Sequence, residues 1–292
     1  MGFFQVINHG ISKTAIEDAF VSSAKFFDLP NDDEEKKKLT SNDIAKPVRF
    51  EGIGSSSSDN NNDSKDNDSK VSKEFIKLYA HPLQDWIHLW PDHPSDFREK
   101  IRNYAMEMRK IGIKFKIVEA IMESLGLSPN YLRDKIEQGM QILVINKYAQ
   151  CYGLPSSSTF INTLGAAPHS DHSIITILLD NTPGLEILDH HSKAWKALPA
   201  VKCALTVLVG DHLEVLSNDI YESVLHGVGL SHRNSRISIG SFQSLAMGDM
   251  VEPALELVDQ DNPKRYRANS FEEYLKHLSS KQPKPYIESL KI

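Results

Sequence analysis

The sequence has little cysteine, no long apolar run and no basic leader. Its two cysteines, Cys151 and Cys203, exclude a disulfide scaffold and a zinc site built from several cysteines. No run approaches the roughly 18 apolar residues of a transmembrane helix, and the N-terminus lacks the basic and apolar regions of a secretory signal. We therefore expect a soluble, cytoplasmic protein without a membrane partner.

Excess positive charge is also lacking. Lys and Arg number 33 and Asp and Glu 39, which leaves a net charge of −6 and argues against a nucleic-acid partner. The 292 residues, 40% of them hydrophobic, are enough for a sizeable core in one large or two modest domains. We expect a monomer whose partner is a small-molecule substrate.

The first 140 residues favour helices. Apolar residues recur every three or four positions from Ser95 to Leu125, which is the spacing of a helix packed on a core. An earlier helix is predicted after Ser12, following a short strand at residues 3–7. Every residue from Ser55 to Lys70 is Ser, Asp, Asn or Lys, so we expect a disordered surface loop at 55–70.

From residue 141 onward the sequence changes to short β-branched runs. Strands are predicted at 141–148, 173–179, 184–188, 205–209, 213–216 and 236–242, and a capped helix at 270–278. This spacing favours a sandwich or jelly-roll barrel over alternating βαβ units. We predict an α+β fold with a mainly β core, in which a helical region (1–140) packs against a jelly-roll (double-stranded β-helix) domain (141–292) that ends in a helix.

A histidine and a carboxylate stand two residues apart in His169-Ser170-Asp171. On a strand, residues i and i+2 point to the same face, so His169 and Asp171 would project together. With a second histidine they would form the 2-His-1-carboxylate site that binds Fe(II). His226, 57 positions after His169, is the candidate third ligand.

A second i, i+2 pair follows in Arg236-Ile237-Ser238, again on a predicted strand. Arg236 can bind a carboxylate through two parallel hydrogen bonds, and Ser238 can add a hydroxyl donor on the same face. A metal triad with a separate carboxylate anchor is suited to binding a dicarboxylic keto acid to iron. The combination is far less expected by chance than either of its parts.

With these motifs in place, the chain resembles the plant family of Fe(II)/2-oxoglutarate-dependent dioxygenases over essentially its whole length. The matching segments are 2–10, 146–148, 168–171, 176–179, 183–185, 210–214, 217–218, 221, 226, 236–238 and 271–274. The metal and keto-acid motifs are specific because they occur together in this order. Residues 86–91 and the long helix are most similar to the branch that contains flavanone 3-hydroxylases and salicylate hydroxylases.

The resemblance implies a role for particular residues. Three would be catalytic Fe(II) ligands, namely His169, Asp171 and His226. Four would hold 2-oxoglutarate, namely Arg236 and Ser238 at its distal carboxylate, with Tyr148 and Asn146 in support. One would stack on an aromatic substrate, namely Phe242.

The resemblance also implies the reaction. Fe(II) and O2 would couple the oxidative decarboxylation of 2-oxoglutarate to hydroxylation, desaturation or demethylation of a substrate, with ascorbate as reductant. The chain would then be an oxidoreductase that acts on a small specialised metabolite of plants, such as a flavonoid or another phenolic compound.

Three alternatives stay open. An iron oxidase on the same fold would need no keto acid and would use Arg236 and Ser238 for another carboxylate. The chain also starts abruptly inside a predicted strand, which we interpret as an N-terminal truncation, so a non-catalytic family member is the second alternative. A cupin-type metal-binding jelly roll is the third, and it would not need Arg236, Ser238 and Tyr148 together.

Overall fold

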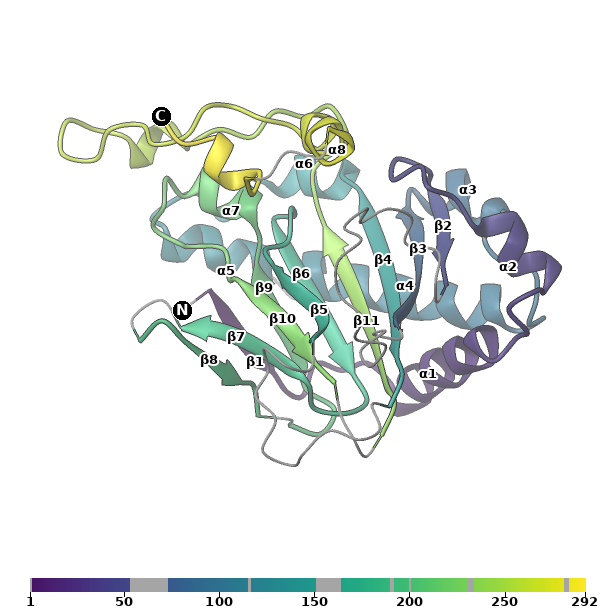
Figure 1. Cartoon of the computed structure of the whole chain (residues 1–292). Coiled ribbons are helices and arrows are strands. Elements are labelled where there is room, and N and C mark those ends of the chain that lie inside the picture. The colour runs from purple at the N-terminus through teal and green to yellow at the C-terminus, as the bar shows by residue number, and fades with distance from the viewer. Residues whose placement is uncertain are drawn as a thin grey trace, which may run out of the picture.

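The structure is a computed structural model that describes residues 2–52, 73–114, 117–150, 164–189, 192–199, 201–230, 234–280 and 284–292. The loop predicted at 55–70 lies outside the described residues. Two antiparallel sheets form the core (Figure 1). The larger sheet has seven strands in the order β1-β9-β6-β11-β4-β3-β2, and the smaller has four in the order β5-β10-β7-β8.

The strands of the larger sheet are β1 (Phe3–Val6), β2 (Val48–Glu51), β3 (Lys73–His81), β4 (Gln141–Tyr148), β6 (Ile175–Asp180), β9 (Leu205–Val209) and β11 (Arg236–Gln243). Those of the smaller sheet are β5 (Leu164–His169), β7 (Leu185–Asp189), β8 (Ala194–Ala197) and β10 (His226–Gly229). This pair of sheets, with helices packed outside it, confirms the predicted α+β fold with a jelly-roll core.

The first 140 residues contribute three strands to the larger sheet in addition to the predicted helices. Strand β3 pairs with β4 from Lys73 opposite Tyr148 to His81 opposite Gln141, so the sheet crosses the predicted boundary at residue 140. A helical description of this region is therefore incomplete. The strand predicted at 3–7 is found as β1, whereas β2 and β3 were not predicted. Strand β3 joins the rest of the sheet only through β4, which begins 60 residues after β3 ends.

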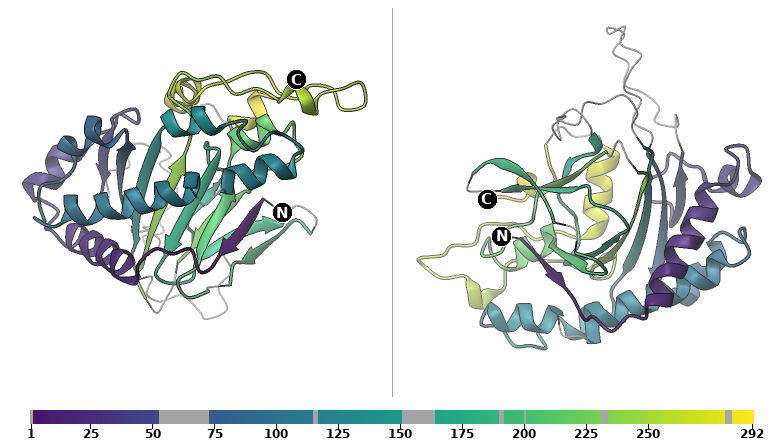
Figure 2. Two further views of the ribbon diagram at one scale, coloured as in Figure 1. Left: turned by 180° about the vertical axis from the view of Figure 1, so that it is seen from behind. Right: turned by 90° about the horizontal axis from the view of Figure 1, so that it is seen from below.

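Helices α1 (Lys13–Phe27) and α4 (Phe97–Lys114) pack on the outer face of the larger sheet, and Figure 2 shows the smaller sheet on its other side. Ser12 caps α1 as predicted, because its side chain accepts a hydrogen bond from the N–H of Ala15. The predicted helix over 95–125 is described as α4 and α5 (Ile117–Ser124), on either side of residues 115–116. Its apolar stripe is buried in the core, as at Ile101 and Met108.

Five further α-helices are described: α2 (Glu34–Leu39), α3 (Leu83–Trp86), α6 (Arg133–Gln138), α7 (Asp211–Leu216) and α8 (Phe271–Ser279). Helix α8 confirms the predicted C-terminal helix, and Ser270 caps it by accepting from the N–H of Glu273. Among the described residues, none of the helices combines the length and the hydropathy that crossing a bilayer requires.

Residues 213–216, predicted as a strand, lie instead in helix α7. All six side chains of α7 are buried, so the helix has no exposed face whose polar residues would reveal the helical period in the sequence. The backbone N–H groups of Gly210, Asp211 and His212 donate to the carbonyls of Ile174, Asp171 and Ser173. The start of α7 thereby holds the segment 171–174, which follows β5.

Candidate functional site

His169, Asp171 and His226 lie together at the mouth of the barrel, where β5 and β10 pair. One ligand atom from each residue lies within 4.8 Å of the other two. Asp171 Oδ1 is 3.8 Å from His169 Nε2 and 3.7 Å from His226 Nε2. Asp171 and His226 are buried, whereas 48% of the His169 side chain is exposed, so this histidine faces the opening.

The second ring nitrogen of each histidine fixes its orientation. His169 Nδ1 lies 2.8 Å from the carbonyl oxygen of Ala167, and His226 Nδ1 lies 3.0 Å from that of Val224. A carbonyl can only accept, so Nδ1 carries the proton and the Nε2 lone pairs point towards Asp171. Burial, and then the neighbouring His226, lower the pKa of His169, which favours the neutral imidazole that a metal needs.

The proximity of His169 and Asp171 has a different cause from the one predicted. Strand β5 ends at His169, and Ser170 and Asp171 follow outside the strand, so the alternation of a strand does not orient Asp171. The carbonyl of Asp171 instead accepts a hydrogen bond of 2.8 Å from the N–H of Asp211 at the start of α7. Helix α7 therefore positions the carboxylate beside the two histidines.

The predicted keto-acid residues share the inner face of the larger sheet. Arg236 is opposite Tyr148 across β11 and β4, and Ser238 is opposite Asn146 in the next row of the same face. The side chains of Arg236, Ser238 and Tyr148 are almost fully buried. As predicted, Arg236 and Ser238 lie on one strand and project from the same side.

Arg236 has a free hydrogen-bond donor in this site. Its Nη2 donates to Asp180 Oδ2 at 2.9 Å and its Nε to the carbonyl of Thr182 at 3.2 Å. Its Nη1 is buried and has no hydrogen-bond partner among the described residues. An unpaired buried guanidinium nitrogen is costly, and a carboxylate ligand would satisfy it.

Tyr148 remains a neutral phenol beside this guanidinium. Burial raises its pKa, while Arg236 and a hydrogen bond with Ser238 act in the opposite direction. The ring centre lies 5.4 Å from the guanidinium carbon of Arg236. The hydroxyl can therefore donate a hydrogen bond near neutral pH.

All eight predicted site residues line one cavity of about 60 Å³. Phe242 lies on the same inner face, opposite Ile142 on β4 and Thr176 on β6, and its ring also packs against a small apolar cluster around Tyr79 and Met140. The cavity is smaller than the several hundred Å³ usual for a metabolite site.

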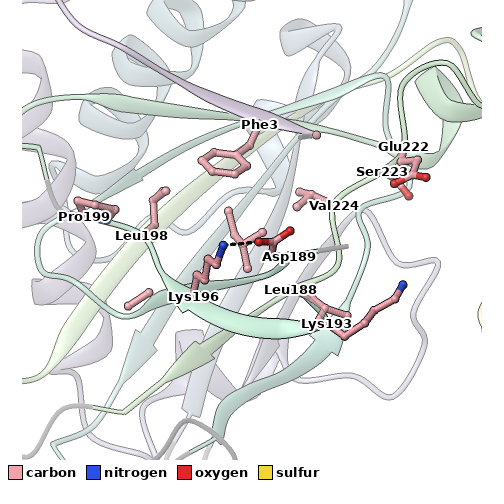
Figure 3. A pocket seen from close by; sticks show the side chains of 13 residues that line it. Phe3, Leu188, Asp189, Lys193, Lys196, Leu198, Pro199, Glu222, Ser223 and Val224 are labelled. Carbon is pink, nitrogen blue, oxygen red and sulfur yellow. Dashed lines mark hydrogen bonds and ion pairs between the residues drawn. The ribbon is translucent and has the colours of Figure 1, made fainter. Parts of the chain in front are cut away.

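A larger hollow, of about 490 Å³, lies at the seam between the edge strands β1 and β8 (Figure 3). Its lining includes apolar side chains such as Phe3 and Val224 and the ion pair of Lys196 with Asp189. None of the triad or of the keto-acid residues reaches it. Converging metal ligands and an unpaired buried donor identify the smaller cavity as the candidate site, despite its size.

The residues at this cavity fit an Fe(II) ion and a dicarboxylic keto acid. Two imidazoles and one carboxylate are the facial donor set of non-haem Fe(II) oxygenases, and they leave coordination positions for other ligands. The unpaired Nη1 of Arg236 supplies the cation that a distal carboxylate needs.

Two residues of this face were missed in the sequence. Asp180 pairs with Arg236, and Lys73 begins β3 opposite Tyr148. The alternation of Lys73, Phe75, Lys77 and Tyr79 with other residues was a signal for the strand. No local pattern, however, indicates which strand would become its partner.

Two family models match the chain. The 2OG-Fe(II) oxygenase superfamily matches residues 139–244, and the N-terminal model described as "non-haem dioxygenase in morphine synthesis" matches residues 1–93. Among solved structures, that of JOX2 in complex with 2OG, Fe and JA is 24% identical with a TM-score of 0.82, over 100% of this chain and 82% of the other. A rice dioxygenase for auxin oxidation has a TM-score of 0.78 at 22% identity, over 100% and 90% of the two chains, so it shares the fold.

Curated relatives are more similar in sequence. The "2-oxoglutarate-dependent dioxygenase 21, chloroplastic" of Oryza sativa subsp. japonica is 42% identical over 100% of this chain and 82% of its own length. Flavanone 3-dioxygenase 3 of the same plant is 40% identical over 100% and 84%. These matches show that the chain belongs to the Fe(II)/2-oxoglutarate-dependent dioxygenases.

Proposed function

We propose that this dioxygenase couples the oxidative decarboxylation of 2-oxoglutarate to the hydroxylation, desaturation or demethylation of a small specialised plant metabolite. The observation that carries the proposal is the unpaired Nη1 of Arg236, whose side chain lines the same cavity as His169, Asp171 and His226. A site that bound iron alone would not need a buried, unsatisfied guanidinium nitrogen.

In this proposal each predicted residue keeps a defined task. Fe(II) is held by His169, Asp171 and His226. The keto acid is held by Arg236, Ser238, Tyr148 and Asn146. When bound, the iron supplies the activation of O2 and the oxidation of the substrate.

The protein supplies orientation and a dry site. The carbonyls of Ala167 and Val224 hold the two imidazoles in the tautomer that presents Nε2. Arg236 and Tyr148, both buried, fix the distal carboxylate at the far side of the cavity from the solvent. Leu178 and Leu208 line the cavity and exclude water from the reacting atoms.

For the substrate we propose a phenolic or flavonoid compound. One relative at 40% identity is named as a flavanone 3-dioxygenase, and Phe242 offers an aromatic ring on the cavity wall. An offset stack of that ring on an aromatic substrate is the expected contact.

The proposal also covers the assembly, the location, the reductant and the domain organisation of the enzyme. We propose a monomeric, cytoplasmic enzyme that uses ascorbate as reductant, with its catalytic residues in the jelly roll of residues 141–292 and a supporting helical region at 1–140. The chloroplastic location in the name of one relative applies to that protein. A fluorescent fusion and analytical ultracentrifugation would test location and assembly.

The proposed function is tested with purified protein, anaerobic Fe(II) and 2-oxoglutarate. A chelated keto acid gives a visible metal-to-ligand charge-transfer band, and we expect this band in the wild type but not in His169→Ala. A folded wild-type protein that gives no band would contradict the proposal and support a non-catalytic family member. Substrate oxidation that continues without 2-oxoglutarate would support an oxidase instead.

A further inference from the structure

A lysine that the predicted site does not include lies beside the candidate cavity. Lys73 on β3, Tyr148 on β4 and Arg236 on β11 are opposite one another across three neighbouring strands, so their side chains project from the same inner face. Lys73 Nζ lies 5.7 Å from the ring centre of Tyr148 and 5.5 Å from that of Phe75. Two aromatic rings therefore flank this ammonium group.

The ammonium of Lys73 differs from the neighbouring cations in its lack of a partner. Arg49 pairs with Glu51 at 3.1 Å, and Arg236 pairs with Asp180 at 2.9 Å. Within the part of the chain that the structure describes, Lys73 Nζ has no carboxylate within 4 Å and no hydrogen-bond acceptor. Cation–π contacts offset only part of the cost of removing it from water.

Its surroundings disfavour the positive charge. Burial lowers the pKa of Lys73, and the charges of Arg236 and Arg49 lower it further, while Glu51 acts in the opposite direction. Tyr148, which lines the candidate cavity, is the neighbour of Lys73 in the same row, so the ammonium lies beside this cavity. An anion next to the ammonium would offset this destabilisation.

We propose that Lys73 binds an anionic group of the primary substrate, so that the enzyme acts on an apolar or aromatic carboxylic acid. The inference rests on the proposed function and narrows its phenolic substrates to those that carry a carboxylate group. Tyr148 and Phe75 form an apolar wall beside the ammonium, which suits an acid with an aromatic or hydrophobic body.

The keto acid has its own anchor. Arg236 keeps Nη1 for the distal carboxylate of 2-oxoglutarate, and Tyr148 on the middle strand lies between Arg236 and Lys73 in the row that the three residues form. The two cations therefore serve two carboxylates, one from each organic reactant.

The test compares Lys73→Gln and Lys73→Arg with the wild type and with Lys147→Gln. Lys147 precedes Tyr148 on β4, projects from the opposite face and pairs with Asp28 at 2.7 Å, so its substitution removes the same charge away from the cavity. The probes are phenylacetate, 3-phenylpropanoate and cinnamate, each with its neutral amide. Calorimetric titration measures their dissociation constants and those of 2-oxoglutarate, with and without Fe(II).

We expect the wild type and Lys147→Gln to bind at least one acid more tightly than its amide. Lys73→Gln should weaken binding of that acid about tenfold or more, as expected for loss of a charge-assisted hydrogen bond, and should leave the amide unaffected. Lys73→Arg should restore most of the preference, and the affinity for 2-oxoglutarate should change less than threefold in every variant.

Three results would overturn the inference. The first is that no acid binds the wild type more tightly than its amide, which includes the case in which no acid binds. The second is an unchanged preference in Lys73→Gln. The third is a tenfold loss of 2-oxoglutarate affinity in Lys73→Gln without loss of acid binding, which would place Lys73 in the keto-acid site. Failure of the charge-transfer band alone would contradict the proposed function, because acid binding is measured without it.

Discussion

The guanidinium of Arg236 on β11 lies over the phenol ring of Tyr148 on β4, with 5.4 Å between the guanidinium carbon and the ring centre. The ring shields one side of the cation from solvent, so a carboxylate that reaches Nη1 binds it in surroundings of low dielectric constant. Charge-assisted bonds are strongest in such surroundings.

Replacing this guanidinium should therefore affect the co-substrate above all. We expect Arg236→Ala to raise the KM for 2-oxoglutarate about a hundredfold, because the loss of one partner of a buried charge pair typically costs 2–5 kcal/mol. Steady-state kinetics with varied 2-oxoglutarate measure the change. Arg265→Ala, which removes an exposed arginine paired with Asp219, serves as the control. An unchanged KM in Arg236→Ala would refute the anchor.

Tyr148→Phe should have a smaller effect of the same kind. The substitution keeps the ring against Arg236 and removes only the hydroxyl, so we expect a roughly threefold to tenfold higher dissociation constant for 2-oxoglutarate. Titration of the charge-transfer band gives this constant. Tyr221→Phe, which loses a hydroxyl bonded to Ser124, should leave the constant as it is. Equal effects of the two substitutions would argue against a role of Tyr148 in keto-acid binding.

His226→Ala should abolish high-affinity Fe(II) binding, because two ligands cannot complete the facial set. Equilibrium dialysis under anaerobic conditions measures bound iron directly and does not depend on a known substrate. His88 is exposed in the 3-10 helix Ile87–Leu89, and His88→Ala should bind iron like the wild type. Full iron occupancy in His226→Ala would exclude this residue as a ligand.

Replacing Gly210, which contacts the segment that carries Asp171, should lower both the stability of the fold and the affinity for iron. A Cβ on Gly210 would lie 2.2 Å from the carbonyl oxygen of Ser173, so Gly210→Ala must displace the segment that carries Asp171. We expect the free energy of unfolding to fall by about 1–3 kcal/mol and iron affinity to fall with it. Gly248→Ala is the matched control, since nothing lies within 4 Å of its added Cβ. Denaturant titration of both variants measures the difference. Equal stability of Gly210→Ala and Gly248→Ala would contradict the predicted clash with Ser173.

Lys77 on β3 should make stability depend on pH. Burial lowers its pKa from 10.5 to about 8, and its Nζ donates a hydrogen bond of 2.6 Å to the carbonyl of Ile44. Between about pH 8 and 10.5 the unfolded chain holds a proton that the folded chain lacks. The contribution of Lys77 to the free energy of unfolding therefore rises with pH in this window and is constant below it.

Lys77→Met lacks this titration. As the pH rises from 7 to 10, the wild type should gain about 2 kcal/mol in its free energy of unfolding relative to Lys77→Met. Urea unfolding at several pH values gives the difference, and Lys135→Met, at an exposed position, should track the wild type. If the free energies of unfolding of Lys77→Met and the wild type changed with pH in parallel, the lowered pKa of Lys77 would be contradicted.

Much of the β core was predictable because its strands are β-branched and bounded by turn residues. The predicted ends of β4 and β9, at 141–148 and 205–209, agree with the structure, and β11 extends one residue past its predicted end. The assembly of His169, Asp171 and His226 followed from the residue types that Fe(II) requires. The alternation of β11 then placed Arg236 and Ser238 on one face.

The remaining features depend on contacts that are distant in sequence. Helix α7 is buried on all sides, so the sequence shows no division into an exposed and a buried face, and its hydrogen bond to Asp171 joins residues 40 positions apart. Lys73 lies in the same row as Arg236 only because β3 pairs with β4 across 75 positions. Such a register is set by the packing of the whole sheet and leaves no mark in the local pattern.

The order of the larger sheet has a consequence for how the protein is made. Strand β11 is the last strand among the described residues, yet it lies between β4 and β6 in the middle of the sheet. During synthesis on a ribosome, β4 and β6 emerge well before it and present unpaired edges until residue 243 has left the exit tunnel. Closure of the sheet and delivery of Arg236 and Ser238 to the candidate site are then one event, so a nascent chain places both side chains only when the middle of its larger sheet is complete.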